Sequence, residues 1–279
     1  MKWQGRRGSD NVEDRRGMST GTKVVGGGIG TLVIVLLVYL LGGDPSGIIE
    51  QSGSQQSAGP VQSTEAEEQM AQFVSVVLAD TEEVWGKIFA EAGATYRKPT
   101  LVLFRDQVQS ACGYATAASG PFYCPADEKV YLDLSFFDDL RARYGVYGDF
   151  AIAYVVAHEI GHHVQNQMGI LEEVQAQRMR LSEVRGNQLT VRLELQADFL
   201  AGVWAHYAQK MFNSIEEGDI DEALNAAASI GDDVLQKKYQ GRVVPDSFTH
   251  GTAAQRSGWL RKGWETGDLN QGDTFSAAI

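Results

Sequence analysis

Hydrophobic positions along this chain form one uninterrupted run and several periodic segments. Residues 24–43 contain no charged side chain over about 20 positions, enough to cross a bilayer as a helix. A buried core helix fits less well, because the run lacks polar positions at helical spacing and ends in Gly-Gly-Asp-Pro. A cleaved signal peptide fits less well too, because no small-x-small site stands immediately after it. We therefore predict a transmembrane helix over residues 24–43.

Past this run the pattern changes to linker and then to a folded domain. Residues 44–64 are rich in Gly, Ser and Gln and predict a flexible linker. Thr64 and Glu67 then form a capping-box pattern, and apolar residues recur at helical spacing up to Gly93. Residues 65–279, about 215 positions, are enough for one hydrophobic core and are predicted as a single domain.

Within that domain helical patterns outnumber strand patterns. Apolar periodicity predicts helices after a cap at Asp149, over roughly 187–211, and over 252–264. Alternation predicts strands at 100–104 and 130–134. The expected fold is a helix-dominated α+β domain with a small sheet.

Charge is distributed unevenly along the chain. The formal net charge is −12, yet residues 1–23 contain six basic and three acidic side chains, and the next Lys or Arg is Lys87. Because basic residues stay on the cytoplasmic side of a membrane, residues 1–23 are predicted as a cytoplasmic tail and the domain as exported across the inner membrane. The acidic remainder lacks the clustered cations that nucleic-acid binding requires, so no nucleic-acid partner is expected.

The strongest chemical motif is His158-Glu159-Ile160-Gly161-His162, at the end of an apolar helical run. Residues at i and i+4 share one face of a helix, so His158 and His162 can bind one zinc ion. Zinc in hydrolytic sites takes three protein ligands and leaves one position for water. A third ligand is therefore required.

The third ligand is expected on the later apolar helix, in Leu193-Glu194-Leu195-Gln196-Ala197-Asp198. Glu194 and Asp198 share a face of that helix, and buried carboxylates need partners. We predict Glu194 as the ligand and Asp198 as the acceptor of a hydrogen bond from His158, with one Zn²⁺ per chain. The alternative is that both acids lie on an exposed face in water. His163 and His206 are expected to be hydrogen-bonded structural histidines.

Two cysteines, Cys112 and Cys124, are present in the whole chain. An even, closely spaced pair in a turn-rich segment of an exported domain predicts a disulfide. Two cysteines at this spacing do not make a zinc site.

Several segments together resemble the bacterial family called putative neutral zinc metallopeptidases, and the His-Glu-x-x-His motif with a later Glu and Asp resembles the gluzincin metallopeptidases. The likeness spans nearly the whole chain and lies in these segments: 2–7, 9–17, Gly120 to Pro125, His158 to His163, and Phe248 to Gly251 with Gln255 and Arg256. The resemblance implies a membrane-anchored zinc peptidase but names no substrate. It also implies that an edge strand, Tyr131 to Phe136, holds the substrate, although a plain structural strand is an equal alternative.

Two classes of function are compatible with these residues. In a membrane-anchored zinc endopeptidase acting on proteins or peptides, Glu159 is the general base. His250 is a candidate to stabilise the oxyanion, with Arg256 orienting it or binding the substrate backbone, although a turn histidine fits its position equally well. The alternative is a catalytically silent adaptor or chaperone-like module at the membrane. Retention of Glu159 favours the enzyme, because a structural zinc site has no use for a general base.

Overall fold

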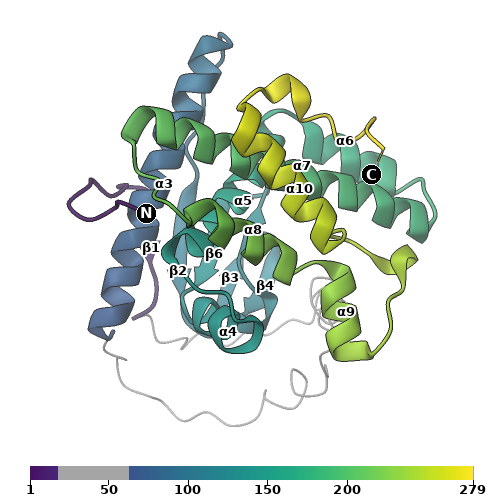
Figure 1. Ribbon diagram of the computed structural model, residues 1–279, viewed down its shortest axis with the longest axis horizontal. Helices are drawn as coiled ribbons and strands as arrows, with labels where there is room; N and C mark the ends of the chain where they lie inside the picture. Colours follow the sequence, from purple (N-terminus) through teal and green to yellow (C-terminus); the bar gives the residue numbers. More distant parts are fainter. Residues whose placement is uncertain (18–62, 279) are drawn as a thin grey trace.

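The centre of the fold is a pair of helices, α5 (Asp149–Gln167) and α7 (Glu183–Phe212). This computed structural model describes residues 1–17 and 63–278 (Figure 1). Helix α10 (Ala253–Thr266) packs along α7, and α5 contacts α7 and several other helices. The domain is a helix-dominated α+β fold with a small sheet, which confirms the predicted fold class.

The small sheet has four strands in the order β1-β2-β6-β5. Strands β1 and β2 and strands β2 and β6 run parallel, whereas β5 and β6 run antiparallel. A separate antiparallel hairpin pairs β3 with β4. The strand bounds are β1 Val12–Asp14, β2 Thr100–Phe104, β3 Gln107–Ser110, β4 Gly113–Thr116, β5 Phe122–Cys124 and β6 Lys129–Asp133.

The remaining helices surround this centre. Helices α3 and α8 contact α5, and α9 follows α8 directly on the path toward α10. Their bounds are α3 Glu65–Glu91, α4 Ser135–Tyr144, α6 Ile170–Arg178, α8 Asp219–Ser229 and α9 Asp232–Gln240, with 3₁₀ turns at Ala117–Ser119, Pro245–Ser247 and Leu269–Gln271.

Helix α5 lies in the core because its first three turns are almost entirely apolar. Every residue from Phe150 to Gly161 is buried, and the ring of Phe150 stacks on Trp204 of α7 at 5.9 Å between centroids. A helix that is apolar on all sides is stable only when other elements cover all sides. The motif histidines are therefore carried on a rigid element.

Most predicted elements match the structure within a few residues. The capping box of Thr64 and Glu67 is confirmed at the start of α3, and the strand predicted at 100–104 is β2. At the start of α5 the cap is Gly148 rather than Asp149, and the carboxylate of Glu222 accepts the N–H of Phe150 instead. A distant side chain thus replaces the local cap that the sequence suggested.

The amino-terminal segment differs from its prediction as a separate tail. Residues 1–17 pack against α3, and β1 forms an edge of the main sheet, so the fold includes residues before Thr64 (Figure 1). A three-residue strand is too short to be recognised from alternation alone.

The predicted membrane helix, residues 24–43, and nearly all of the predicted linker lie outside the described residues. Within the described ranges, no helix combines the length and the apolar character needed to cross a bilayer.

Candidate metal centre

His158 and His162 lie one turn apart on α5, with their rings close together. The ring centroids are 4.9 Å apart and the rings are nearly perpendicular. His158 is 7% exposed, so it sits at the inner end of the site. Both rings point their Nε2 atoms toward the same carboxylate, which belongs to Glu194.

Helix α7 supplies Glu194 at the same point. Its Oε2 atom lies 3.2 Å from Nε2 of His158 and 3.4 Å from Nε2 of His162. The two helices approach closely because Gly161 has no side chain. A Cβ atom there would lie 3.0 Å from the carbonyl oxygen of Ala197. The glycine inside the motif is thus what admits the ligand helix.

The donor set and its spacing fit a zinc ion. Ligand atoms in tetrahedral zinc sites have bonds of about 2.0–2.2 Å, which places neighbouring ligands about 3.4 Å from each other. The two nitrogen–oxygen separations to Glu194 are 3.2 and 3.4 Å, and all three donor atoms lie within 4.8 Å of one another. Two imidazoles and one carboxylate also match the ligand types of hydrolytic zinc sites.

Each histidine is held by a hydrogen bond at its other ring nitrogen. Nδ1 of His158 lies 2.8 Å from Oδ1 of Asp198, and Nδ1 of His162 lies 2.8 Å from Oε1 of Gln165. Such contacts fix the orientation and tautomer of a ligand histidine. Gln165 was not anticipated from the sequence, although its position three residues after His162 was a usable signal.

Asp198 is itself held by a buried network. Arg256 donates to both Asp198 oxygens, at 2.9 and 3.1 Å, and the hydroxyl of Tyr154 donates to Oδ1 at 2.6 Å. Burial raises the pKa of Asp198, but the charges of Arg256 and His158 outweigh it and lower that pKa to about 2. Asp198 is therefore a carboxylate at any physiological pH.

The expected role of Arg256 is not supported. Its side chain is 3% exposed and its donors are committed to Asp198, Tyr154 and the carbonyl of Ile230. Because it is nearly fully buried, it is not placed to bind a substrate backbone, and its charge acts to lower the pKa of His250. It supports the metal centre through Asp198, which in turn holds His158.

The charges of the donor residues shift one another's pKa values. Burial lowers the pKa of His158, but Asp198 and Glu194 outweigh it and raise the pKa to about 10. Burial likewise lowers the pKa of His162, and Glu194 raises it above its usual value. Burial raises the pKa of Glu194, but the two histidines hold it well below its usual range. The negative charges of Glu194 and Asp198 thus favour a cation at the two rings.

Glu159 lies beside the ligand pair. It is 9% exposed, and its negative charge contributes to raising the pKa of His162. It follows His158 directly on α5, so it points about 100° around the helix from that ligand. The structure places it next to the donor cluster but not within it.

His250 lies in a loop that Asp232 organises. Oδ2 of Asp232 accepts the N–H groups of Thr249, His250 and Gly251 at 2.7, 2.6 and 3.0 Å. Oδ1 lies 3.4 Å from Nδ1 of His250. Burial lowers the pKa of His250, but Asp232 and the nearby charge of Glu194 raise it above its usual value. His250 therefore sits within the field of the metal centre. Asp232 was missed from the sequence because its hydrogen bonds to this loop span 17 to 19 residues.

The other two histidines are structural. His163 is fully buried between the Tyr123 hydroxyl, at 3.0 Å, and the Arg97 carbonyl, at 2.6 Å. Burial lowers the pKa of His163. Nδ1 of His206 lies 2.8 Å from the carbonyl of Trp264.

Strand β5 contacts helix α5, and the assignment of an edge strand to Tyr131–Phe136 is wrong. Strand β6 lies between β2 and β5, so both of its edges are occupied. Strand β5 is an outer strand, and its Tyr123 reaches α5 through His163 and Asn166. Its three residues gave no alternation to detect. Cys124, at the end of β5, forms a disulfide with Cys112.

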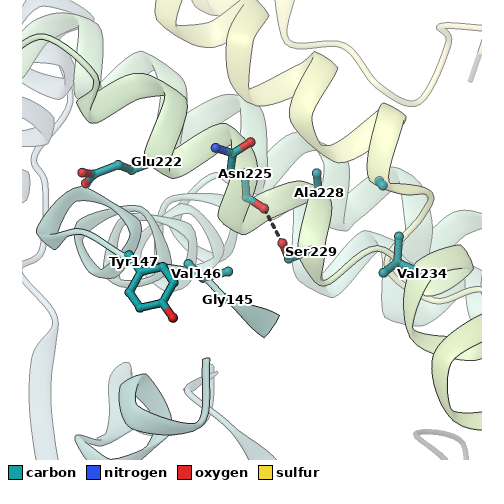
Figure 2. Close-up of a pocket in the computed structure, with 9 residues that line it drawn as sticks. Gly145, Val146, Tyr147, Glu222, Asn225, Ala228, Ser229 and Val234 are labelled. Carbon is teal, nitrogen blue, oxygen red and sulfur yellow. Dashed lines mark hydrogen bonds between the residues drawn. The ribbon is translucent and has the colours of Figure 1, made fainter. Parts of the chain in front are cut away.

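A separate pocket opens between the end of α4 and helix α8 (Figure 2). None of its lining residues is a candidate ligand or a hydrogen-bond partner of one. It is lined by Gly145, Val146, Tyr147, Glu222, Asn225, Ala228, Ser229, Val234 and Ala253.

Comparisons with known proteins agree with this geometry. A family model described as "Putative neutral zinc metallopeptidase" matches residues 1–275. "Uncharacterized protein YpfJ" of Escherichia coli strain K12 is 46% identical over 288 residues, covering 100% of both chains. "Uncharacterized protein Rv2575" of Mycobacterium tuberculosis strain H37Rv and "Uncharacterized protein Mb2605" of Mycobacterium bovis are each 46% identical over 193 residues, covering 66% of this chain and 64% of theirs. No solved structure shows significant similarity to the chain.

Proposed function

Because the chain belongs to the putative neutral zinc metallopeptidase family, we propose that it is a zinc-dependent endopeptidase that hydrolyses peptide bonds in proteins or peptides. The observation that carries the proposal is the convergence of His158, His162 and Glu194 at separations suited to tetrahedral zinc, with Glu159 beside them. The carboxylate ligand comes from a later helix, which is the gluzincin arrangement.

His158, His162 and Glu194 would hold one zinc ion, with Asp198 and Gln165 fixing the two rings. Zinc in such a site lowers the pKa of a water molecule toward about 7 and polarises the scissile carbonyl. Ligands mounted on two packed helices keep this geometry rigid, which is a requirement for catalysis.

Glu159 is proposed to move the proton. Its carboxylate would accept a proton from the attacking water and deliver it to the leaving amine. Its place on α5, next to His158, puts it within the same turn as the ligands. Proton transfer of this kind contributes about 10² to 10⁴ in rate.

His250 is proposed to stabilise the oxyanion. Asp232 faces Nδ1 of the ring and raises its pKa, which favours a ring that can donate from Nε2. Its three hydrogen bonds to the loop also preorganise the position of the histidine. Preorganised donors near developing negative charge are a large contribution in acyl-transfer enzymes.

An extended substrate is proposed to pair with β5. This strand has β6 on one side only, and at its other edge no strand lies among the described residues. Edge strands bind extended peptides through backbone hydrogen bonds. Tyr123 ties β5 to the helix that carries both histidines, so a peptide on this edge would pass near the metal centre.

Attachment to the cytoplasmic membrane through residues 24–43, with the domain outside the cytoplasm, is part of the proposal. The disulfide between Cys112 and Cys124 supports the oxidising side of the membrane, because structural disulfides persist there.

The decisive experiment compares wild type with Glu159→Gln and Glu194→Ala. We expect Glu159→Gln to retain about one zinc and to lose peptidase activity by about 10² or more, whereas Glu194→Ala loses zinc. Amino-terminal labelling of the exported proteome from cells with wild-type or Glu159→Gln protein would identify the cleaved substrates. Identical sets of protein amino termini would favour the silent adaptor instead.

A further inference from the structure

The first seventeen residues are built into the domain as an extended segment. Strand β1 pairs in parallel with β2, with Val12 opposite Leu101 and Asp14 opposite Leu103. Before the strand, the N–H of Ser9 donates to the carbonyl of Ser75 on α3 at 3.0 Å. The segment therefore shares backbone hydrogen bonds with both the sheet and α3, and it lies beside that helix in Figure 1.

Two buried carboxylates of α3 obtain partners from this segment. Asp80 is 3% exposed and receives two hydrogen bonds of 2.6 Å from the guanidinium of Arg6. Glu82 is 2% exposed and accepts from Ser9 at 2.6 Å and from Asn11 at 2.7 Å, in addition to Lys98 of the domain at 3.0 Å. Buried carboxylates without such partners are strongly unfavourable. This face of α3 is thus complementary to the segment in charge as well as in shape.

Close packing fixes the register of the contact. A Cβ atom at Gly8 would fall 2.5 Å from Oγ of Ser75, so a side chain at this position would collide with α3. Trp3 packs edge-on against Phe73, with centroids 5.4 Å apart. A specific residue sequence, rather than a generic basic tail, fits this surface.

The basic character of the segment follows from the same contacts. Each of its four arginines forms an ion pair with a carboxylate, Arg6 with Asp80, Arg7 with Glu83, Arg15 with Glu13 and Arg16 with Asp14 and Glu68. The charge asymmetry that predicted a cytoplasmic amino terminus therefore has a second explanation. Arg6, Arg7 and Arg16 pair with carboxylates of α3, whereas Arg15 pairs within the segment.

From these contacts we infer that residues 1–17 and the metal-binding domain lie on the same side of the membrane; the placement of that side outside the cytoplasm rests on the proposed function and on the disulfide between Cys112 and Cys124. A single crossing between residues 17 and 63 would separate the segment from α3 and leave Asp80 without Arg6 and Glu82 without Ser9 and Asn11. This inference replaces the predicted orientation in which the amino terminus and the domain face opposite sides. It is independent of peptidase activity.

Single-cysteine labelling in cells tests the inference directly. Arg7, whose side chain is 58% exposed, and Met179, 78% exposed, are replaced by cysteine in separate full-length chains. Cells with a permeabilised outer envelope are treated with a membrane-impermeant maleimide, and the parent chain measures the background. We expect both positions to be labelled. Labelling of both only after the inner membrane is opened would keep them on one side but overturn their placement outside the cytoplasm. Labelling of Met179 alone would overturn the inference entirely.

A designed disulfide tests the contact itself. A Cβ at residue 8 lies 3.3 Å from Cβ of Ser75, slightly below the separation of about 3.5–4.5 Å found in disulfides, and Ser75→Cys removes the Oγ atom that this Cβ would otherwise meet. In membranes carrying the pair Gly8→Cys and Ser75→Cys, with a protease site inserted between residues 50 and 60, oxidation should keep the two cleaved fragments together on a non-reducing gel. The matched pair Gly8→Cys and Gly86→Cys should not, because residue 86 lies eleven residues after Ser75, about 16 Å further along α3. Separation of the fragments in the first pair would contradict the contact.

Discussion

Gly161 of α5 lies against the backbone of Ala197 on α7, at the point where the two helices bring their metal ligands together. A Cβ atom at Gly161 would lie 3.0 Å from the carbonyl oxygen and 3.1 Å from the Cα of Ala197. Contacts this short force the helices apart by a few tenths of an ångström. Because Glu194 is three residues before Ala197, its distance to the histidines depends on this contact.

Gly161→Ala is therefore expected to weaken zinc binding by about 10-fold, the lower end of what misplaced ligand supports produce. A gain of about 1 kcal/mol in helix propensity opposes an overpacking cost of about 1–3 kcal/mol, so the free energy of unfolding falls only slightly. Chelator competition measures the affinity. Gly86→Ala is the control, because nothing lies within 4 Å of its Cβ position. An unchanged affinity in Gly161→Ala would show that the helices separate without moving Glu194.

Arg256→Gln is expected to destabilise the protein and to loosen His158. The substitution leaves the Asp198 carboxylate fully buried without its cation, which costs about 3–5 kcal/mol. Thermal unfolding of the purified protein should shift downward by about 6–20 °C. Zinc affinity should fall as well, because Asp198 then holds Nδ1 of His158 less firmly.

Asp198→Asn provides the control for that experiment. Combined with Arg256→Gln, it removes the unpaired charge, so the double variant should be more stable than Arg256→Gln alone. If the stability losses of Asp198→Asn and Arg256→Gln add up in the double variant, Arg256 stabilises the fold through contacts other than its ion pair with Asp198.

The sequence pattern predicted the candidate ligands and Asp198, but it did not predict the other residues that hold the site in place. His158, His162, Glu194 and Asp198 each lie at i and i+4 of an apolar helix, and that spacing predicts which side chains share a face. Gln165 and Asp232 act through contacts that only folding creates. Short-range spacing carries information about one helix, but not about which helix lies opposite it.

The elements missed were short or paired over a long range. Strands β1 and β5 have three residues each, too few for a visible alternation, and β1 joins the sheet by pairing with residues about 90 positions away. Arg6 and Arg16 looked like a basic tail because their carboxylate partners include distant side chains on α3. The helix-dominated fold class was predictable because long amphipathic helices carry their own signal.

Zinc binding is expected to release protons, and the affinity should keep rising with pH above neutrality. Burial lowers the pKa of His158, but Asp198 raises it to about 10, so the metal-free ring is protonated at pH 7.5. Because the pKa of His158 is raised, protons compete with zinc for this ring at low and neutral pH. The competition ends only when the pH rises above that pKa. Calorimetry in buffers of different ionisation enthalpy measures the number of protons released.

Asp198→Asn tests the cause of this pH dependence. Without the carboxylate the pKa of His158 falls, so fewer protons should leave on zinc binding at pH 7.5. An unchanged proton count would assign the effect to Glu194, which also faces both rings.

His250→Ala is expected to separate catalysis from metal binding. If His250 donates to the oxyanion, the variant should retain zinc and fold, while kcat falls by about 10² to 10³, the loss expected for one such donor. KM should change little, because the hydrogen bond strengthens in the transition state.

The companion variant Asp232→Asn retains an oxygen for the N–H groups of Thr249, His250 and Gly251 but removes the charge beside Nδ1. Its kcat should fall less than that of His250→Ala, with the pH profile shifted toward lower pH because the pKa of His250 drops. Loss of zinc in His250→Ala would instead make the histidine a support of the metal centre, and an unchanged kcat would leave it as a turn residue.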